Sequence, residues 1–133
     1  PSDLQQFELH IEKYLQAREN ICMQYENSLF SFKNIKFPKV MKNSKHARHL
    51  FTTWVEPSKR DEIMYKLENS KIGVTVNYRA IHLLNYYKKT FGFKNGVLPI
   101  AERIGDSTIT LPMYPKMTNS EVKCVIDAFK NSL

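Results

Sequence analysis

The chain has 133 residues, of which 42% are hydrophobic and 12% aromatic, so it is long enough for one domain with a genuine core and is not disordered by composition. No apolar run approaches the ~18 residues of a membrane span, and no basic segment leads into an apolar one as in a signal peptide. The net charge of +7 is compatible with an anionic partner. Cys22 and Cys124 have no metal-site spacing, so we expect two reduced core thiols in a cytoplasmic protein.

A long helix is predicted over residues 2–29. Ser2 is a good N-cap, and Gln5 can complete a capping box. At ~1.5 Å per residue the helix would be about 40 Å long, so we expect it to bridge to a neighbouring domain or subunit, with the N-terminal half of its apolar stripe exposed. The chain starts at Pro1 without a methionine, which favours a fragment of a longer protein. The stripe consists of Leu4, Phe7, Ile11, Tyr14, Ile21, Tyr25 and Leu29.

Residues 30–46 form a basic connection. No acidic residue occurs between Glu26 and Glu56, and a basic residue recurs at every third position. Two interpretations are open. The stretch is either a solvated loop, because it mixes lysines with a proline and has no helical period, or a surface for a nucleic acid or for the phosphates of a small ligand. The basic residues are Lys33, Lys36, Lys39, Lys42, Lys45 and Arg48.

The next four elements alternate between strand and helix. Residues 49–55 read as a strand that Pro57 ends, and residues 73–78 as a second strand. Between them a helix begins at a Ser58 cap and ends before Gly73, with Ile63, Met64 and Leu67 facing inward. A further helix is predicted over 82–91, stopped by Gly92.

The remainder contains a helical turn after Pro99, a short strand over 107–115 and a last helix over 118–131. Thr118 caps that helix and Glu121 completes a capping box. The predicted fold class is α+β: a small sheet of about three strands covered by helices, with a long N-terminal linking helix. The inward positions of the last helix are Val122, Val125, Ile126 and Phe129.

Candidate binding residues gather where the strand at 73–78 gives way to the helix at 82–91. His82 and Tyr86 are four residues apart, so they would share a helix face. Arg79, next to Tyr78, precedes the helix N-terminus, where free backbone N–H groups favour an anion. Together they could hold a polyhydroxylated or phosphorylated ligand. The alternative is a surface arginine, a capping histidine and two half-buried tyrosines. No nucleophile motif, zinc spacing or phosphate loop is present, so the sequence assigns no catalytic or metal-binding residue.

An ordered series of motifs extends through most of the chain. The strand enters N-Y-R-x-x-H, and a Y-Y pair, "FGF", P-x-A-E-x-I and "GDSTITLPMYP" follow. In this order and spacing the series resembles the C-terminal segment of the DegT/DnrJ/StrS-type sugar aminotransferases. "HLFTTWV" resembles the preceding strand of that family, and the first helix resembles the one that leaves its large domain.

The resemblance implies a fold of the aspartate-aminotransferase type, with residues 1–30 as the linking helix from a large domain and 31–133 as the C-terminal small domain. It implies a pyridoxal-phosphate enzyme that aminates a keto group on a nucleotide-linked sugar, with glutamate as amino donor and a homodimer as the assembly. It places His82 near the substrate sugar, with Tyr78 and Arg79 just before it. Asn77 departs from the histidine of many relatives, which leaves its role open.

The family binds its cofactor through a lysine of the large domain, so we expect this chain alone to bind no pyridoxal phosphate and to be inactive. The segment "SFKNIK" imitates the spacing around that lysine, but it lacks the Gly/Glu-rich run and follows the linking helix. Lys36 is therefore predicted to be a surface residue. The alternative function is a free-standing, non-catalytic module that binds an anionic partner through residues 33–48. If the chain is part of an aminotransferase, nucleic acid is not an expected partner.

Overall fold

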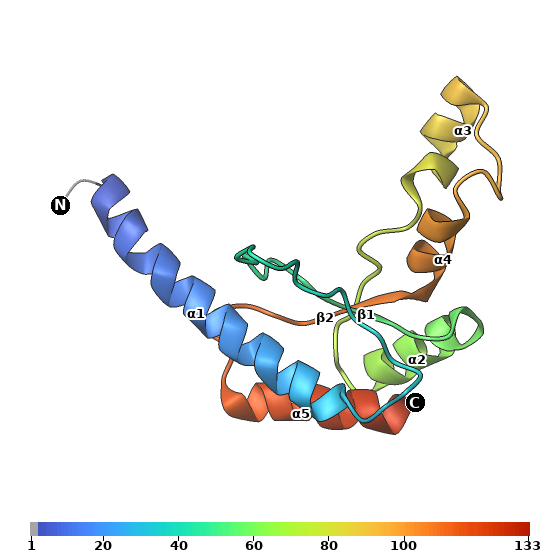
Figure 1. Ribbon diagram of the computed structural model, residues 1–133. Coiled ribbons are helices and arrows are strands. Elements are labelled where there is room, and N and C mark those ends of the chain that lie inside the picture. The colour runs from blue at the N-terminus through green and yellow to red at the C-terminus, as the bar shows by residue number, and fades with distance from the viewer. Residues whose placement is uncertain (1–2) are drawn as a thin grey trace.

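The computed structural model describes residues 3–133, with side chains in the first helix from His10 onward. That helix, α1 (Asp3–Leu29), runs over the predicted residues, and its C-terminal half lies beside the last helix, α5 (Asn119–Ser132) (Figure 1). Ile11 and Tyr14 are 40% and 41% exposed, so the predicted exposure of the stripe is confirmed at these two positions. The predicted cap at Ser2 and the side chains of Leu4, Gln5 and Phe7 lie outside the described part.

Two short strands, β1 (Phe51–Trp54) and β2 (Thr108–Leu111), form an antiparallel sheet. They confirm the strands predicted at 49–55 and 107–115, with shorter bounds. The third predicted strand, at 73–78, is reduced to one bridge between Thr75 and Thr110. The ladder stops there because the Asn77 N–H donates to the Thr110 hydroxyl, at 3.3 Å, and not to a carbonyl of β2.

The core lies where α1, α5 and α2 (Pro57–Asn69) meet the sheet. The ring of Tyr25 is fully buried 4.8 Å from that of Phe51, and its hydroxyl donates to the carbonyl of Pro112 at 2.7 Å. Each buried aromatic side chain removes a large apolar area from water, which is the main stabilising term in a domain of this size. The predicted inward residues of α5 are all buried: Val122, Val125, Ile126 and Phe129.

Capping differs between the last helix and α2. The capping box of α5 is confirmed, since the hydroxyl of Thr118 accepts from the Glu121 N–H and the Glu121 carboxylate accepts from the Thr118 N–H. The predicted Ser58 cap of α2 is wrong, because the helix begins at Pro57 with Glu56 as N-cap. Proline is favoured at the first helical position, where its missing N–H would have no partner in any case.

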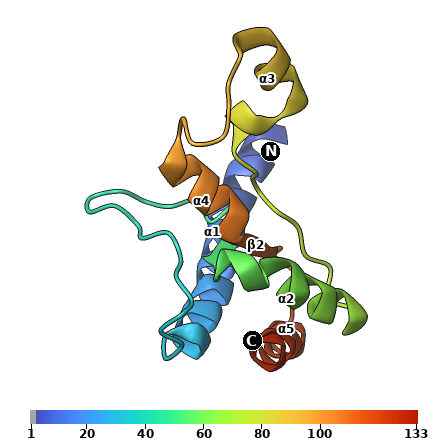
Figure 2. The same cartoon turned by 90° about the vertical axis from the view of Figure 1, so that its right-hand side faces the viewer.

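A second group of short helices extends away from α5, starting at α4 (Pro99–Ser107), which packs against α2 and β1. It also contains η1 (Ile81–Leu83) and α3 (Asn85–Phe91). In Figures 1 and 2, α3 lies at the opposite end of the molecule from α5, and none of its residues is buried. The single helix predicted over 82–91 is wrong: Leu84 has an extended backbone, with ψ of 147°, and separates η1 from α3.

The two cysteines differ in their surroundings. Cys22 is fully buried in the core, and burial raises the pKa of its thiol to about 12. Cys124 is exposed on α5, so the prediction that it is a core residue is wrong. Within the described residues, no helix is long and apolar enough to cross a membrane.

Candidate functional site

A cavity of about 500 Å³ lies between η1 and α4. It brings together three of the four residues singled out from the sequence, Tyr78, Arg79 and His82. Tyr86 does not line it, although its neighbour Tyr87 on α3 does, and the extended backbone at Leu84 separates α3 from η1. The remaining lining residues are Ala80, Ile81, Tyr87, Phe93, Leu98, Ala101 and Ile104.

The expected shared helix face of His82 and Tyr86 is therefore wrong. His82 is 6% exposed on η1, whereas Tyr86 is 67% exposed on α3 with its ring edge-on to that of Tyr87, at 5.4 Å. The expected helix N-terminus beside Arg79 is also wrong, because η1 has three residues and provides too few aligned peptides for an anion site. Arg79 is exposed and lines the cavity, so any anion bound there would meet its guanidinium and not a helix N-terminus.

Among the described residues, the side chain of His82 has one hydrogen-bond partner, the carboxylate of Glu102. His82 Nε2 lies 3.0 Å from Glu102 Oε1, and the two side chains are only 6% and 15% exposed. The ring of Phe93 lies edge-on to the imidazole, with centroids 6.0 Å apart. Glu102 belongs to the P-x-A-E-x-I motif, but sequence reasoning assigned it no role. Glu102 is 20 positions after His82, and nothing in that spacing indicates the contact.

Glu102 also holds the loop that precedes α4. Its two carboxylate oxygens accept from the N–H of Gly96 at 2.9 Å, and Oε1 accepts from the N–H of Leu98 at 3.2 Å. The N–H of Gly96 and the His82 ring hold the pKa of the Glu102 carboxyl below its usual value. Gly96 has φ of +91°, a conformation that glycine adopts readily, and in it the N–H meets the carboxylate.

The segment that carries Tyr78 and Arg79 is fixed from two sides. Thr75 and Thr110 exchange backbone hydrogen bonds of 2.8 and 3.3 Å. On the other side α4 approaches closely at Gly105, where a Cβ would lie 2.6 Å from the nitrogen of Ala80. The irregular segment that carries Tyr78 and Arg79 is therefore held in place by strand β2 and by helix α4.

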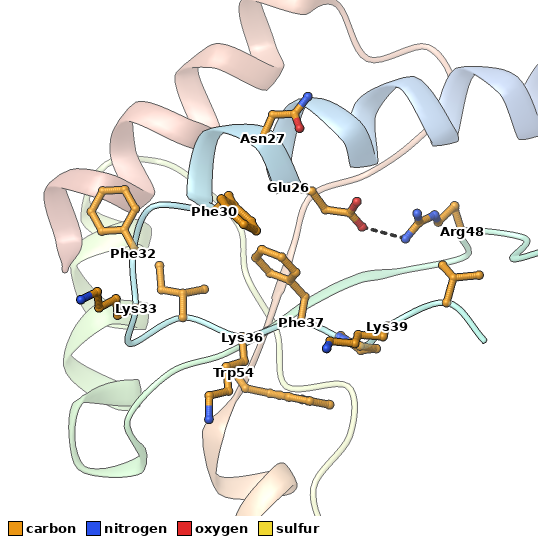
Figure 3. Close-up of a pocket in the computed structure, with 13 residues that line it drawn as sticks. Glu26, Asn27, Phe30, Phe32, Lys33, Lys36, Phe37, Lys39, Arg48 and Trp54 are labelled. Atoms are coloured by element: carbon orange, nitrogen blue, oxygen red, sulfur yellow. Dashed lines mark hydrogen bonds and ion pairs between the residues drawn. The ribbon is translucent and has the colours of Figure 1, made fainter. Parts of the chain in front are cut away.

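A second cavity, of about 860 Å³, lies between the end of α1 and the basic connection (Figure 3). The rings of Phe30, Phe37 and Trp54 line it together with Lys36 and other basic residues. Figure 3 shows the Lys33 amine pointing away from the rings of Phe30 and Phe37. Lys36 is exposed, as predicted, and its backbone pairs with that of Trp54.

Arg48, the last of the basic residues that recur at every third position, is a buried structural residue. Its guanidinium donates to both oxygens of Glu19, at 2.8 and 3.0 Å, and to Glu26 at 2.9 Å. The hydrogen bonds from Arg48 lower the pKa of the Glu19 carboxyl. These ion pairs to Glu19 and Glu26 hold the basic connection against α1 and neutralise Arg48. Among the residues that the structure describes, the unpaired positive charges at the second cavity are therefore those of Lys33, Lys36 and Lys39.

Comparison with known proteins assigns the chain to a family. Residues 4–130 match the model of the DegT/DnrJ/EryC1/StrS aminotransferase family. The chain belongs to this family. It is 34% identical over 117 residues to Uncharacterized protein MJ1066 of Methanocaldococcus jannaschii, covering 85% of this chain and 30% of that protein. It is 31% identical over 119 residues to the spore coat polysaccharide biosynthesis protein SpsC of Bacillus subtilis, covering 86% and 31%.

Solved structures support the same assignment. The Streptococcus pneumoniae protein Spr1654 in its apo form superposes with a TM-score of 0.86 at 28% identity, over 97% of this chain and 33% of that chain. S. venezuelae DesV, in complex with a ketimine intermediate, superposes with a TM-score of 0.85 at 26% identity, over 92% and 33%. The aminotransferase-type fold expected from the sequence is thereby confirmed. The chain spans about a third of the length of the relatives it matches.

The family implies pyridoxal phosphate as cofactor. The lysines of this chain do not have the buried setting that a Schiff base to this cofactor requires. A Schiff-base lysine needs an apolar setting that lowers its pKa. All 15 lysines lie between Lys13 and Lys130; Lys130 is half-buried and the others are exposed. Within the described residues, no lysine amine is therefore buried in the way that a cofactor-bound lysine requires.

Proposed function

We propose that this chain is the C-terminal part of a pyridoxal-phosphate-dependent aminotransferase that aminates a keto group on a nucleotide-linked sugar. The observation that carries the proposal is the match of residues 4–130 to the aminotransferase family. The name of the Bacillus subtilis relative, a spore coat polysaccharide biosynthesis protein, supports a role in polysaccharide or amino-sugar biosynthesis.

The cavity between η1 and α4 suits a sugar on physical grounds. Sugar rings present apolar C–H faces and hydroxyl edges, and the cavity offers the apolar walls of Phe93 and Leu98 with the polar groups of Tyr78 and His82. The guanidinium of Arg79 can bind a phosphate oxygen pair in a bidentate manner. Tyr86, packed edge-on against Tyr87, would contact a ligand that extends beyond the cavity.

In this proposal residues 1–30 link a large cofactor domain to a small domain formed by 31–133. The cofactor supplies the electronic chemistry when it is bound, and the small domain closes and lines the substrate side. Glutamate is the proposed amino donor, a homodimer the proposed assembly and the cytoplasm the proposed location. The chain alone is proposed to be inactive, because its lysines are not placed to hold the cofactor.

The test uses the full-length protein with pyridoxal phosphate, glutamate and a keto-sugar nucleotide. We expect an amino-sugar nucleotide and 2-oxoglutarate, both identified by mass spectrometry. After borohydride reduction and proteolysis, the cofactor should be found on a lysine outside these 133 residues. Cofactor attached to Lys36, or no amino sugar from any keto-sugar nucleotide tried, would contradict the proposal.

The second cavity favours a second candidate function, the binding of an anionic partner through residues 33–48. Within the described part of the chain, Lys33, Lys36 and Lys39 have no ion-pair partner. The exposed ring of Phe30 and the half-buried rings of Phe37 and Trp54 line the same cavity. Lysines interleaved with aromatic side chains suit a single-stranded nucleic acid, whose phosphates meet the amines while bases stack on the rings.

A fluorescein-labelled single-stranded oligonucleotide is the probe for this candidate. If the second function is correct, fluorescence anisotropy should show binding that weakens with salt and is lost in Lys36→Gln/Lys39→Gln. Lys88→Gln/Lys89→Gln on α3 removes the same charge from another surface and is the matched control. Equal weakening in both variants would identify non-specific charge attraction and remove the second candidate.

A further inference from the structure

We propose that Glu102 is the positioning residue of His82: it fixes the imidazole with its Nε2–H toward the carboxylate and leaves Nδ1 to accept a hydrogen bond from a hydroxyl of the ligand. The hydroxyl-bearing ligand rests on the proposed function. The orientation of the ring rests on the structure alone and can be tested separately.

The carboxylate is held independently of the histidine. Backbone N–H groups of Gly96 and Leu98 bind it at 2.9 to 3.2 Å, so its place is set by the loop before α4. An ionised carboxylate only accepts hydrogen bonds. The nitrogen that faces it, His82 Nε2 at 3.0 Å, must therefore carry the hydrogen.

The second ring nitrogen is left for the ligand. His82 Nδ1 has no hydrogen-bond partner in the described part of the chain. It is not sealed inside the core, since Arg18 Nε is the one fully enclosed side-chain nitrogen or oxygen without a partner among the described residues. In the neutral ring with Nε2–H, Nδ1 only accepts, so it pairs with a hydroxyl and not with a phosphate or carbonyl oxygen.

This gives His82 and Arg79, both of which line the cavity, different tasks. His82 accepts from a sugar hydroxyl, whereas the guanidinium of Arg79 only donates and suits phosphate oxygens. The same carboxylate that orients His82 also holds the loop bearing Leu98, which lines the cavity. Glu102 therefore couples the direction of the imidazole to the position of an apolar wall.

Nitrogen-15 NMR of the full-length protein, labelled at histidine only, reports the tautomer directly. The signals of His82 are identified by their loss in His82→Gln. We expect the Nε2–H tautomer in the wild type and a shift toward a mixture in Glu102→Gln. Glu121→Gln is the matched control, because Glu121 also accepts from a backbone N–H at the start of a helix but lies on α5; it should leave the His82 signals unchanged.

An Nδ1–H tautomer in the wild type would overturn the proposal. This measurement uses the wild-type protein, so it decides the question even if Glu102→Gln fails to fold. Activity provides the second readout. Glu102→Gln should lower kcat/KM on the order of 10- to 100-fold, the loss typical when a group that orients a metal-binding histidine is removed. The same change should add little in a His82→Ala background, whereas a merely structural role predicts additive losses.

The two proposals fail in different ways. The Nε2–H tautomer together with normal kcat/KM in His82→Ala would refute the sugar site and leave the orienting role of Glu102 intact. An Nδ1–H ring together with a large loss in His82→Ala would refute the role of Glu102 and leave the site.

Discussion

Replacing His82 with alanine in the full-length protein is expected to lower kcat/KM by at least about fivefold, because one hydrogen bond between neutral groups contributes on the order of 1 kcal/mol. The loss should reach about 10²- to 10⁴-fold if Nδ1 also takes a proton during the reaction. A loss confined to KM identifies binding alone, whereas a loss in kcat identifies an interaction made in the transition state. The assay measures amino-sugar formation from a keto-sugar nucleotide over a range of concentrations.

The control for this variant is His49→Ala. His49 is exposed and lies outside the cavity of His82, so its removal should leave kcat/KM and thermal unfolding near the wild-type values. His82 is buried, so His82→Ala will also lower the unfolding temperature somewhat. The site assignment therefore depends on kcat/KM measured where the variant is fully folded. A folded His82→Ala protein with wild-type kcat/KM would remove this residue from the site.

Periodicity predicted the elements of this chain well where each side chain packs on a neighbouring element. The capped last helix and the C-terminal half of the first helix are confirmed because apolar spacing and capping act locally and agree with the tertiary packing. The helix predicted over 82–91 failed for the opposite reason. The seven-residue helix α3 that forms there has no buried residue. No tertiary packing therefore stabilises one continuous helix through η1 and α3.

The site was predictable only in part. The series of motifs placed Tyr78, Arg79 and His82 near one another, and the cavity brings them together. Glu102 was not found, because its contact with His82 depends on how α4 packs, and sequence spacing carries no information on that. The structural role of Arg48 was hidden in the same way, since its partners lie 22 and 29 residues away on α1.

Gly105 is another residue whose importance only the packing reveals. It lies inside α4, where glycine is disfavoured and alanine would be preferred by about 1 kcal/mol from propensity alone. Its carbonyl accepts from the buried guanidinium of Arg60 at 3.2 Å. A Cβ at this position would lie 2.6 Å from the nitrogen of Ala80 and 3.2 Å from the carbonyl carbon of Arg79. Both are backbone atoms, which cannot rotate away as the end of a side chain can.

We therefore expect Gly105→Ala to destabilise the protein by about 1–3 kcal/mol, the usual cost of overpacking, despite the gain in helix propensity. Gly73→Ala is the matched control: a Cβ there meets nothing within 4 Å, so the change should be neutral or slightly stabilising. Denaturant unfolding of both variants measures the difference. Relief of the clash must move either α4, which carries Glu102, or the segment that carries Arg79. Gly105→Ala should consequently lower kcat/KM and shift the tautomer of His82. Equal stability of Gly105→Ala and Gly73→Ala would contradict the close approach of α4 to the backbone of residues 79–80.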